Sequence, residues 1–430
     1  MQLYRRGKTP DVESVMYLVS MRSRLSLILF FLAYILSFVD RQIVAVLGVQ
    51  IRDAFSLDNV QIGLLYGSAF SVMYALAGIP MGWLADRISR KWMIVTGILG
   101  WSLMTMWSGW ATSISMLITA RMLLGVSQAM LSPAVYSFLA VHYSASQRAT
   151  IFSIYASGIF IGVGLSFLAG GTIAQLYDWQ TAMIAVAWPG FIVAALIVFL
   201  VHEPARTLPN SSIIVKMDVS YGPWLSSAKR MFRNRSIFLH MTGFSLLACT
   251  GYTLLAFISI LFQDVYQRSD LTPSFGWFFF GVALMVILSG KLADLLARHK
   301  PSRRYWMGIV SAAALPLYVI ALKSSDAGTA FWFLGLGVLI GSSYNGVATA
   351  ILHDYIADDQ RGFITGLYLF VVSIAGFGLG PPLAGFLMDT VFEGPQAVQN
   401  SLIALITVCN LLAMVFFFIA EKRHESDAVR

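Results

Sequence analysis

An acid and a base lie side by side in the middle of an apolar stretch near the start of the chain. The stretch is AYILSFVDRQIVAVLGV, residues 33–49, and the charged pair is Asp40 and Arg41. An ionisable residue near the centre of a membrane helix costs at least about 2.5–3.5 kcal/mol and by default indicates a functional site. A carboxyl group there can take up and release a proton, and a guanidinium group can hold an anion.

Adjacent residues on a helix project about 100° apart, so Asp40 and Arg41 do not face each other and each needs its own partner or water. Burial favours the neutral carboxyl and a nearby arginine favours the charged one. Asp40 is therefore our candidate for proton coupling. The alternative is a permanent ion pair that only joins two helices.

The composition defines the class of protein. Of the 430 residues, 58% are hydrophobic and 12% are charged, whereas a soluble domain has about 25% charged residues. Apolar runs of about 20 residues, each long enough to cross a bilayer, recur along the chain. We predict an all-α polytopic membrane protein. A transmembrane β-barrel is excluded, because its strands would be about 10 residues long with alternating polarity.

We expect twelve transmembrane helices, with both termini in the cytoplasm of a bacterial cell and the chain in the inner (plasma) membrane. Most of the 29 Lys and Arg fall on the side of the N-terminus, whereas Arg52, Arg268 and Lys323 fall on the other. This is the bias that sets membrane topology. It explains the net charge of +8, so no nucleic-acid partner is implied. The predicted spans are 25–50, 60–84, 92–113, 115–140, 149–174, 181–202, 237–263, 273–296, 304–322, 329–352, 362–388 and 399–420.

Nothing in the sequence indicates a cofactor or a metal. The two cysteines, Cys249 and Cys409, both lie in apolar spans and predict neither a disulfide framework nor a metal cluster. Residues 1–24 are mixed and basic and do not resemble a cleaved signal peptide.

A polar, basic segment at 203–236 divides the spans six and six. The predicted organisation is a cytoplasmic segment, a six-helix bundle, a cytoplasmic linker, a second six-helix bundle and a cytoplasmic tail. These comprise residues 1–24, 25–202, 203–236, 237–420 and 421–430.

The two halves repeat each other. GWLADRISR at 82–90 is echoed by GKLADLLAR at 290–298, an offset of 208, and RATIFSIY at 148–155 by RGFITGLY at 361–368, an offset of 213. Internal repeats are a recurrent feature of secondary transporters, whose substrate site lies between the repeats near the membrane midplane.

These motifs carry a family resemblance. GWLADRISRK at 82–91 resembles the signature loop between spans two and three of the major facilitator superfamily, and RMLLGVSQA at 121–129 resembles its span-four motif. Within the superfamily, three stretches are most similar to Spinster-type transporters and their bacterial relatives. They are residues 38–57, 61–93 and 125–155.

Organic-anion and sugar-acid symporters, which also have an Asp-Arg pair in span one, are the main rival to the Spinster resemblance. One departure from the Spinster pattern concerns the proton site. Spinster-like sequences usually have an acid where this chain has Gln128. A glutamine does not titrate, so any proton role of that acid is missing here or rests on Asp40.

The resemblance implies a central cavity lined by spans one, four, seven and ten. By helix rise, Asp40 lies about 15 Å from the outer end of span one, between Arg121 at about 9 Å and Gln128 at about 20 Å in span four. The resemblance thus places Asp40, Arg41, Arg121 and Gln128 around one polar patch. Arg41 or Arg121 would hold an anionic group of the substrate.

The other wall of that cavity is uncharged. Span seven (237–262) and span ten (332–352) contain no Lys, Arg, Asp or Glu, and span ten contributes Tyr344 and Asn345 as polar candidates. One charged and one apolar wall favour an amphipathic substrate, although apolar faces also simply pack. The resemblance agrees, because known Spinster members move lysophospholipids and sphingoid phosphates. We expect lysolipid-like substrate, protons and membrane lipids as partners, and a monomer.

The signature loop predicts a cytoplasmic gate. Gly82 would allow close approach of helices, and Asp86 would accept hydrogen bonds from the N-terminus of span eleven, the facing helix by resemblance. Arg87, Arg90 and Lys91 would pair with acids nearby, or would only set the topology.

Other function classes lack their motifs. No GxxxxGK[ST] sequence indicates an ATP-driven pump, and neither HExxH nor GxSxG indicates an enzyme. We predict a proton-coupled transporter working by alternating access. The alternatives are a symporter or antiporter of organic anions, sugar acids or sugar phosphates, and, in a different class, a channel.

Overall fold

The computed structural model describes residues 12–85, 87–143, 145–203, 229, 231–353, 355 and 361–428, with side chains omitted at 12–22, 145–150, 153, 353, 361–363 and 425–428. Asp86 and most of the predicted linker, residues 204–228 and 230, lie outside the described residues. No strand occurs in the part of the chain that the structure describes.

Helices account for nearly all described residues of the N-terminal half. They are α1 (Val12–Val46), α2 (Gly48–Phe55), α3 (Asn59–Gly63), α4 (Ala69–Ala85), α5 (Arg90–Gly109), α6 (Ile114–Gln128), α7 (Leu131–His142), α8 (Ala145–Leu165), α9 (Gly171–Leu176) and α10 (Trp179–Leu200). Two π-helical turns, η2 (Leu64–Ser68) and η3 (Ser166–Gly170), join α3 to α4 and α8 to α9.

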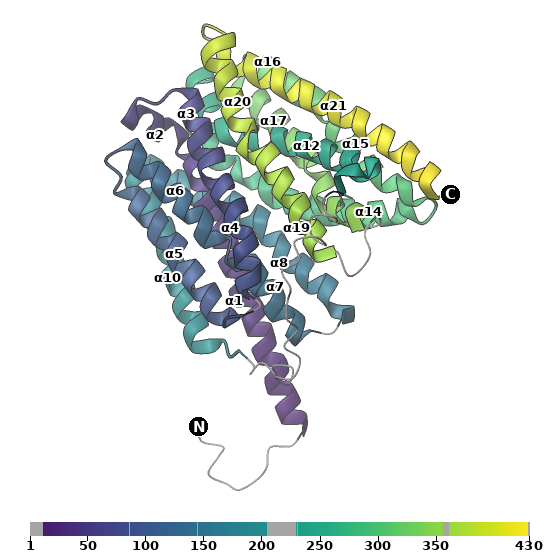
Figure 1. Cartoon of the computed structure of the whole chain (residues 1–430). Coiled ribbons are helices and arrows are strands. Elements are labelled where there is room, and N and C mark those ends of the chain that lie inside the picture. The colour runs from purple at the N-terminus through teal and green to yellow at the C-terminus, as the bar shows by residue number, and fades with distance from the viewer. Residues whose placement is uncertain are drawn as a thin grey trace.

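The C-terminal half has more interrupted helices. Its elements are α12 (Arg235–Ile260), η4 (Leu261–Val265), α13 (Leu271–Ser274), α14 (Gly276–Ala297), η5 (Pro301–Tyr305), α15 (Trp306–Ala312), α16 (Leu315–Lys323), α17 (Ala327–Gly341), η6 (Ser343–Gly346), α18 (Ala348–His353), α19 (Arg361–Val372), η8 (Ser373–Gly378), α20 (Gly380–Phe386), η9 (Leu387–Val391) and α21 (Ala397–Ala428). In Figure 1 this half is green to yellow and lies beside the purple and blue N-terminal half.

Eleven stretches of the described residues are long and apolar enough to cross a membrane. The remaining predicted span, 92–113, is α5, whose twenty residues span about 30 Å but which falls short in hydropathy. Hydroxyl and indole residues spread along α5 cause the shortfall, and some of them surround Asp40. The chain is thus an all-α polytopic membrane protein, and α5 completes the twelve expected helices.

Acidic and hydroxyl caps begin several helices on the side away from the chain termini, called the far side below. Asp178 accepts a hydrogen bond from Thr181 N (2.6 Å) at the start of α10, and Asp58 forms a capping box with Gln61 at α3. Such caps satisfy backbone amides that lack a partner within the helix. The amide of Thr181 also holds the pKa of Asp178 below its usual value.

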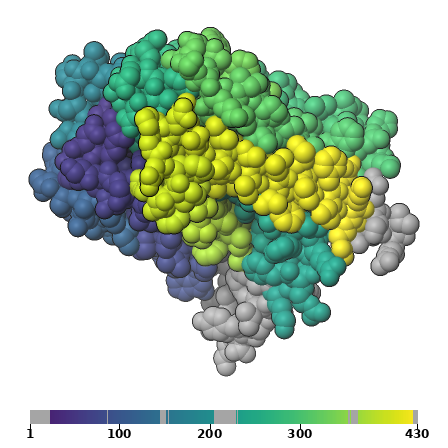
Figure 2. Space-filling view, turned by 90° about the horizontal axis from the view of Figure 1, so that it is seen from above, coloured from purple at the N-terminus to yellow at the C-terminus, as the bar shows by residue number. Residues whose placement is uncertain are grey.

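The two halves meet tightly on the far side. A Cβ atom added to Gly63 of α3 would lie 2.5 Å from the carbonyl oxygen of Pro381 in α20, and one added to Gly385 would lie 2.3 Å from the oxygen of Asn59. Figure 2, which looks onto this side, shows the purple α2–α3 segment directly against the yellow-green C-terminal segments. Only glycine permits such an approach of two backbones.

The opposite side, which carries the termini and is called the terminal side, lacks this approach. A Cβ atom on Gly78 or Gly82 of α4, or on Gly366 of α19, would meet no described atom within 4 Å. The close helix contact expected at Gly82 is therefore absent in this conformation. The far side is closed, whereas at these three glycines α4 and α19 make no close approach to any described atom.

Gly63→Val should open the far side, because the new methyl groups cannot fit against Pro381 and overpacking costs about 1–3 kcal/mol. Spin-label distances across α3 and α20 should lengthen. The matched control is Gly78→Val, which adds the same side chain where space is open. Equal distance distributions in the two variants would contradict the prediction.

Candidate functional site

Arg41 and Gln128 join α1 to α6 inside the N-terminal half. Nε and Nη2 of Arg41 donate to Oε1 of Gln128 at 3.2 and 3.0 Å. The amide of Gln128 donates in turn to the carbonyl oxygen of Ser37 at 2.7 Å, and the Gln128 side chain is buried. Both groups of the amide are therefore used to hold α1 and the Arg41 guanidinium.

Three aromatic rings also surround the Arg41 guanidinium. Its Cζ atom lies 4.3 Å from the ring centre of Phe38, 4.4 Å from Phe70 and 4.9 Å from Tyr74. Such cation–π contacts stabilise a positive charge without neutralising it. Within the described part of the chain no carboxylate forms an ion pair with Arg41.

Arg41 also reaches the boundary between the halves. It is partly exposed, and Tyr252 on α12, in the C-terminal half, lies within electrostatic range of its charge. The positive charge of Arg41 thus faces the interior between the two bundles.

Arg121 braces the backbone of α1 rather than facing open space. Its side chain is 1% exposed, Nη1 donates to the carbonyl oxygen of Asp40 (3.0 Å) and Nη2 to that of Arg41 (2.9 Å). Both terminal nitrogens of Arg121 are thus engaged, and burial closes the whole side chain, including the unpaired Nε, to a substrate. Of the two arginines predicted to hold an anion, the structure leaves only Arg41 accessible.

The carboxyl group of Asp40 is buried on the other face of α1. It is 1% exposed, and neither oxygen has a hydrogen-bond partner among the described residues. Its neighbours are Trp101 and Thr105 of α5 and the Arg121 guanidinium, and Nε1 of Trp101 and Oγ1 of Thr105 also lack partners. A carboxylate in such a place is costly unless it pairs or takes up a proton.

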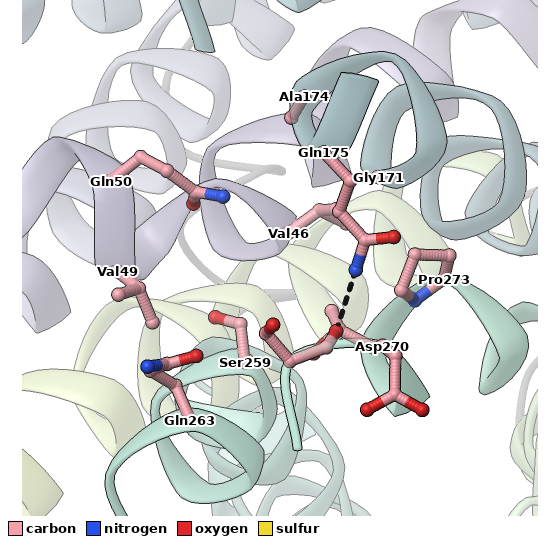
Figure 3. Close-up of a pocket in the computed structure, with 12 residues that line it drawn as sticks. Val46, Val49, Gln50, Gly171, Ala174, Gln175, Ser259, Gln263, Asp270 and Pro273 are labelled. Atoms are coloured by element: carbon pink, nitrogen blue, oxygen red, sulfur yellow. Dashed lines mark hydrogen bonds between the residues drawn. The ribbon is translucent and has the colours of Figure 1, made fainter. Parts of the chain in front are cut away.

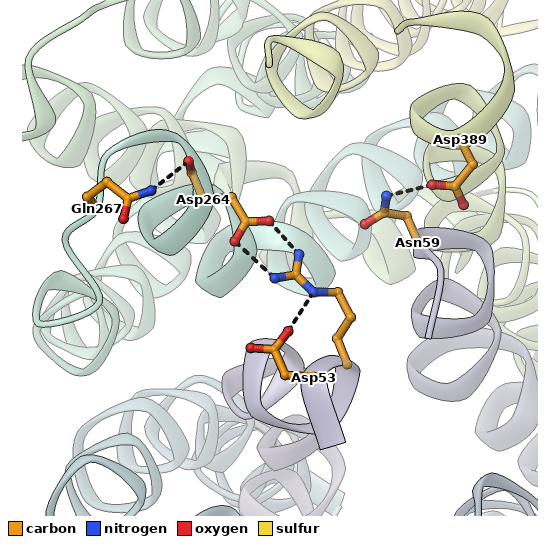
Figure 4. Close-up of polar contacts among 6 residues, drawn as sticks. Asp53, Asn59, Asp264, Gln267 and Asp389 are labelled. Carbon is orange, nitrogen blue, oxygen red and sulfur yellow. Dashed lines mark hydrogen bonds and ion pairs between the residues drawn. The ribbon is translucent and has the colours of Figure 1, made fainter. Parts of the chain in front are cut away.

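Polar contacts close the far side between the halves (Figure 4). Arg52 forms an ion pair with Asp264 through both terminal nitrogens, which raises the pKa of Arg52, and also contacts Asp53. Asp389 accepts hydrogen bonds from Nδ2 of Asn59 (2.6 Å) and from the backbone nitrogen of Val60 (2.9 Å). The contacts of Arg52 with Asp264 and of Asp389 with Asn59 and Val60 join elements of opposite halves, and together they form the far-side latch.

A pocket of about 530 Å³ lies on the far side between α1–α2, α9, α12–η4 and α13 (Figure 3). Its polar lining includes Gln50, Gln175 and Gln263, and Nε2 of Gln175 donates to the oxygen of Ser269 at 2.8 Å. Its lining includes none of Asp40, Arg41, Arg121 and Gln128. This pocket is therefore separate from the charged network.

The arrangement of two helical bundles is shared with a known protein family. The family profile described as Major Facilitator Superfamily matches residues 30–377 and again 275–430. The chain belongs to the major facilitator superfamily. It is therefore a transporter, not an enzyme, and the family predicted from the signature loop is confirmed.

Relatives of this superfamily member include an efflux pump, a sugar-acid transporter and a Spinster homologue. It is 26% identical over 400 residues to an MFS-type efflux pump of Mycolicibacterium smegmatis, covering 92% of this chain and 91% of that one. It is 24% identical to a D-galactonate transporter of Escherichia coli (92% and 96% covered) and 24% identical to protein spinster homolog 1 of Xenopus laevis (87% and 75% covered).

A solved structure shares the fold of this superfamily member. The crystal structure of a bacterial homologue of the human lysosomal transporter Spinster, in an inward-facing and unoccupied conformation, superimposes with a TM-score of 0.81 at 22% identity. The match covers 94% of this chain and 98% of that one. The Spinster resemblance is thus confirmed, and the sugar-acid rival is also present among the relatives.

The predicted site residues divide between the halves. Asp40, Arg41, Arg121 and Gln128 are brought together in one network. Tyr344 and Asn345 lie apart from it in η6, where Tyr344 is buried and Asn345 is exposed with Nδ2 donating to the oxygen of Ser342 at 3.1 Å.

The basic residues of the signature loop attach to their own half. The backbone nitrogens of Arg90 and Lys91 donate to the Glu203 carboxylate at 2.9 and 3.2 Å, and Nζ of Lys91 donates to the oxygen of Val198 at 2.7 Å. Arg87 stacks on Trp83 with Cζ 3.7 Å from the ring centre. The acid that contacts the loop is thus Glu203. From the sequence, this residue was only the first residue of the predicted linker.

Sequence reasoning missed the donors around Asp40. Trp101 and Thr105 stand at positions i and i+4 of a mostly apolar helix, and both are buried. Polar residues at helical spacing within a membrane span were the signal that could have found them.

Arg52→Gln should weaken the far-side latch, because the ion pair with Asp264 is lost while the fold is untouched. Exposed pairs contribute about 0.2–1 kcal/mol, so the far-side-open population should rise up to about fivefold, less at high salt. Spin-label distances between α2 and η4 measure it. Asp53→Asn, which keeps the Asp264 pair, should behave as wild type, and a shift of the same size in that control would contradict the prediction.

Proposed function

We propose that this protein is a proton-coupled secondary active transporter that works by alternating access and carries an amphipathic, anionic, lysolipid-like substrate between its two bundles. The observation that carries the proposal is the pairing of two features on one turn of α1. A buried carboxyl group lies next to an accessible arginine, and among the described residues the first has no hydrogen-bond partner and the second no carboxylate partner.

Charge distribution assigns the two sides. The terminal side carries most of the basic residues and is therefore the cytoplasmic side, with both termini in the cytoplasm and the chain in the plasma membrane. The closed far-side latch and the open space at Gly78, Gly82 and Gly366 then describe a conformation that faces inward. The support for an inward-facing conformation is thus the closed latch together with the open space at these glycines.

Asp40 is the proposed proton-binding group. Water reaching the site would favour its charged form, whereas burial without an ion pair or hydrogen bond from the described residues favours the protonated form. Because Arg121 donates to the carbonyl oxygens of Asp40 and Arg41, a change in the tilt of α1 against α6 would alter the field at the carboxyl. Protonation and conformation are thereby linked.

Arg41 is the proposed anion-binding group. An acid at position 128 would neutralise it, whereas the Gln128 amide orients the guanidinium and leaves its charge available. Across the boundary, α12 offers aromatic and apolar groups such as Tyr252, which stacks on Phe377 with ring centres 4.4 Å apart. An anionic head group at Arg41 and an apolar tail against α12 fit an amphipathic substrate. The proposed transporter acts as a monomer.

A sugar-acid or organic-anion transporter is the second candidate. This candidate is favoured by the same available arginine and by the 24% identity, over 92% of this chain, to a D-galactonate transporter. A sugar acid would use the Arg41 charge and would leave the apolar side of the boundary unused.

Substrate-evoked proton movement tests the proposal. The protein is reconstituted into liposomes loaded with a pH-sensitive dye, and lysophosphatidic acid is compared with galactonate and glucose 6-phosphate, with protein-free liposomes as the leak control. A saturable response to the lysolipid supports the proposal. A response to galactonate or to the sugar phosphate alone assigns the second class, and a non-saturating flux without counterflow indicates a channel.

Asp40→Asn should abolish proton-coupled accumulation and keep substrate exchange, because an amide is isosteric with the carboxyl and does not titrate. The melting temperature should stay equal or rise, since the amide cannot become a buried, unpaired charge. Counterflow and pH-driven uptake are measured on the same liposomes. Full pH-driven uptake in the variant would contradict the assignment.

Arg41→Gln should weaken binding of an anionic substrate by about 10- to 100-fold, because a charge-assisted hydrogen bond contributes about 1.5–3 kcal/mol. The affinity is obtained from competition in the counterflow assay. Monoacylglycerol, which lacks the phosphate, should lose less than about twofold in the same variant. An equal loss for both lipids would show a structural effect instead.

A further inference from the structure

Two three-ring clusters occupy matching positions in the two halves. In the N-terminal half Tyr34 stacks on Tyr155 with ring centres 4.2 Å apart and planes at 19°, and Tyr136 meets Tyr155 edge-on at 5.3 Å. These rings come from α1, α7 and α8, the first, fourth and fifth spans.

In the C-terminal half the corresponding rings are His240, Tyr344 and Tyr368, from the seventh, tenth and eleventh spans. His240 stacks on Tyr368 at 5.3 Å and 14° and meets Tyr344 edge-on at 5.8 Å. The pair Tyr155 and Tyr368 keeps the repeat offset of 213 residues. His240 therefore occupies the place that Tyr34 holds in the first repeat.

The clusters differ in their hydrogen bonds. The hydroxyl of Tyr155 is buried and has no hydrogen-bond partner among the described residues. In the second cluster Nδ1 of His240 lies 2.6 Å from the Tyr344 hydroxyl, and Nε2 lies 2.9 Å from the carbonyl oxygen of Ala348 and 3.1 Å from the Tyr368 hydroxyl. His240 has no exposed surface.

These partners define the tautomer of His240. A carbonyl oxygen only accepts hydrogen bonds, so Nε2 carries the hydrogen and donates it to Ala348. Nδ1 then has no hydrogen and accepts from the Tyr344 hydroxyl. The neutral ring thus makes one donated and one accepted bond to the same segment of span ten.

That segment is a break in the helix. Between α17, which ends at Gly341, and α18, which begins at Ala348, the chain forms the short 3₁₀ turn η6. Irregular backbone at membrane depth is stable only where polar partners satisfy it. His240 bonds to Tyr344 within the turn and to Ala348, the first residue of the helix that follows it.

The remaining titratable groups near the ring are phenols. Tyr305 on η5 meets His240 edge-on at 5.8 Å, and its hydroxyl continues to Tyr355 at 3.1 Å, which lies 2.5 Å from Nδ1 of His424. No carboxylate contacts the His240 ring within the described part of the chain. Hydrogen bonding and stacking, rather than an ion pair, hold the cluster.

We propose that His240 is a positioning residue of the transport cycle: it holds the break in span ten and Tyr368 of span eleven to span seven, so that these three helices move as one unit. The inference rests on the proposed alternating access. Span ten would line the substrate path, and α19 is the helix that must approach α4 when the terminal side closes. His240 would therefore transmit a change at the Tyr344 turn to that gate.

The test compares variants that separate the ring from its hydrogen bonds. His240→Phe keeps the ring and loses both bonds, whereas His240→Gln can donate to Ala348 and accept from Tyr344 without a ring. Tyr344→Phe removes one of the same bonds. The matched control is Tyr155→Phe, at the repeat-related position of Tyr368, where the hydroxyl has no partner to lose.

The readout needs no substrate. Spin labels are placed at Ile79 on α4 and Gly366 on α19, both exposed, in a background in which Cys249 and Cys409 are replaced by serine. Distance distributions are recorded in lipid nanodiscs from pH 5 to pH 8. No transported molecule is added, so the result does not depend on whether the proposed substrate class is correct.

Tyr344→Phe should change the ratio of long to short distances by about tenfold, the size of one buried hydrogen bond, and His240→Phe, which loses both bonds, should change it at least as much. The double variant should differ from the stronger single variant by less than about twofold, because both remove the same bond. His240→Gln and Tyr155→Phe should stay within about twofold of wild type.

Three results would overturn the proposal: an unchanged distribution in His240→Phe, additive effects in the double variant, or equal effects of His240→Gln and His240→Phe. Melting temperatures identify any variant that fails to fold. In that case Tyr344→Phe and Tyr368→Phe, which each lose one hydroxyl, carry the same test against Tyr155→Phe.

Discussion

The site depends on the two hydrogen bonds from Arg121 to the carbonyl oxygens of Asp40 and Arg41. They hold α6 against α1 at the level of the charged pair. With α1 fixed, the Asp40 carboxyl turns toward α5, and the Arg41 guanidinium turns toward Gln128 and the boundary between the halves. One buried guanidinium thus separates an acid and a base that are adjacent in the chain and gives each a different environment.

A second constraint acts between the halves. Glycines at the far side bring α3 and α20 into backbone contact, and the Arg52 and Asp389 contacts add polar links to the same closure. Backbone contact resists partial opening, whereas exposed ion pairs contribute little. The closure is therefore mainly steric, and the polar links adjust its balance.

The halves also differ in how they hold their central helices. The first repeat uses stacked tyrosines and an arginine bound to carbonyl oxygens. The second uses a neutral histidine bound to the broken part of span ten. The repeat is visible in the sequence because its motifs recur at nearly one spacing. The histidine at the place of Tyr34 is visible only when the rings are seen to stack, since Tyr34 and His240 differ in type and lie outside the repeated motifs.

The sequence by itself determined that this chain spans the membrane, that it consists of two repeats, that it resembles the major facilitator superfamily and that Asp40, Arg41, Arg121 and Gln128 lie at similar depth. These follow from hydropathy, spacing and helix rise, which are local or periodic properties. Only the tertiary structure decided which arginine is accessible, that Trp101 and Thr105 face Asp40, that Glu203 binds the signature loop, and which side of the molecule is closed. Each of these depends on helix rotation and packing between segments far apart in sequence, and no periodic pattern encodes such rotations.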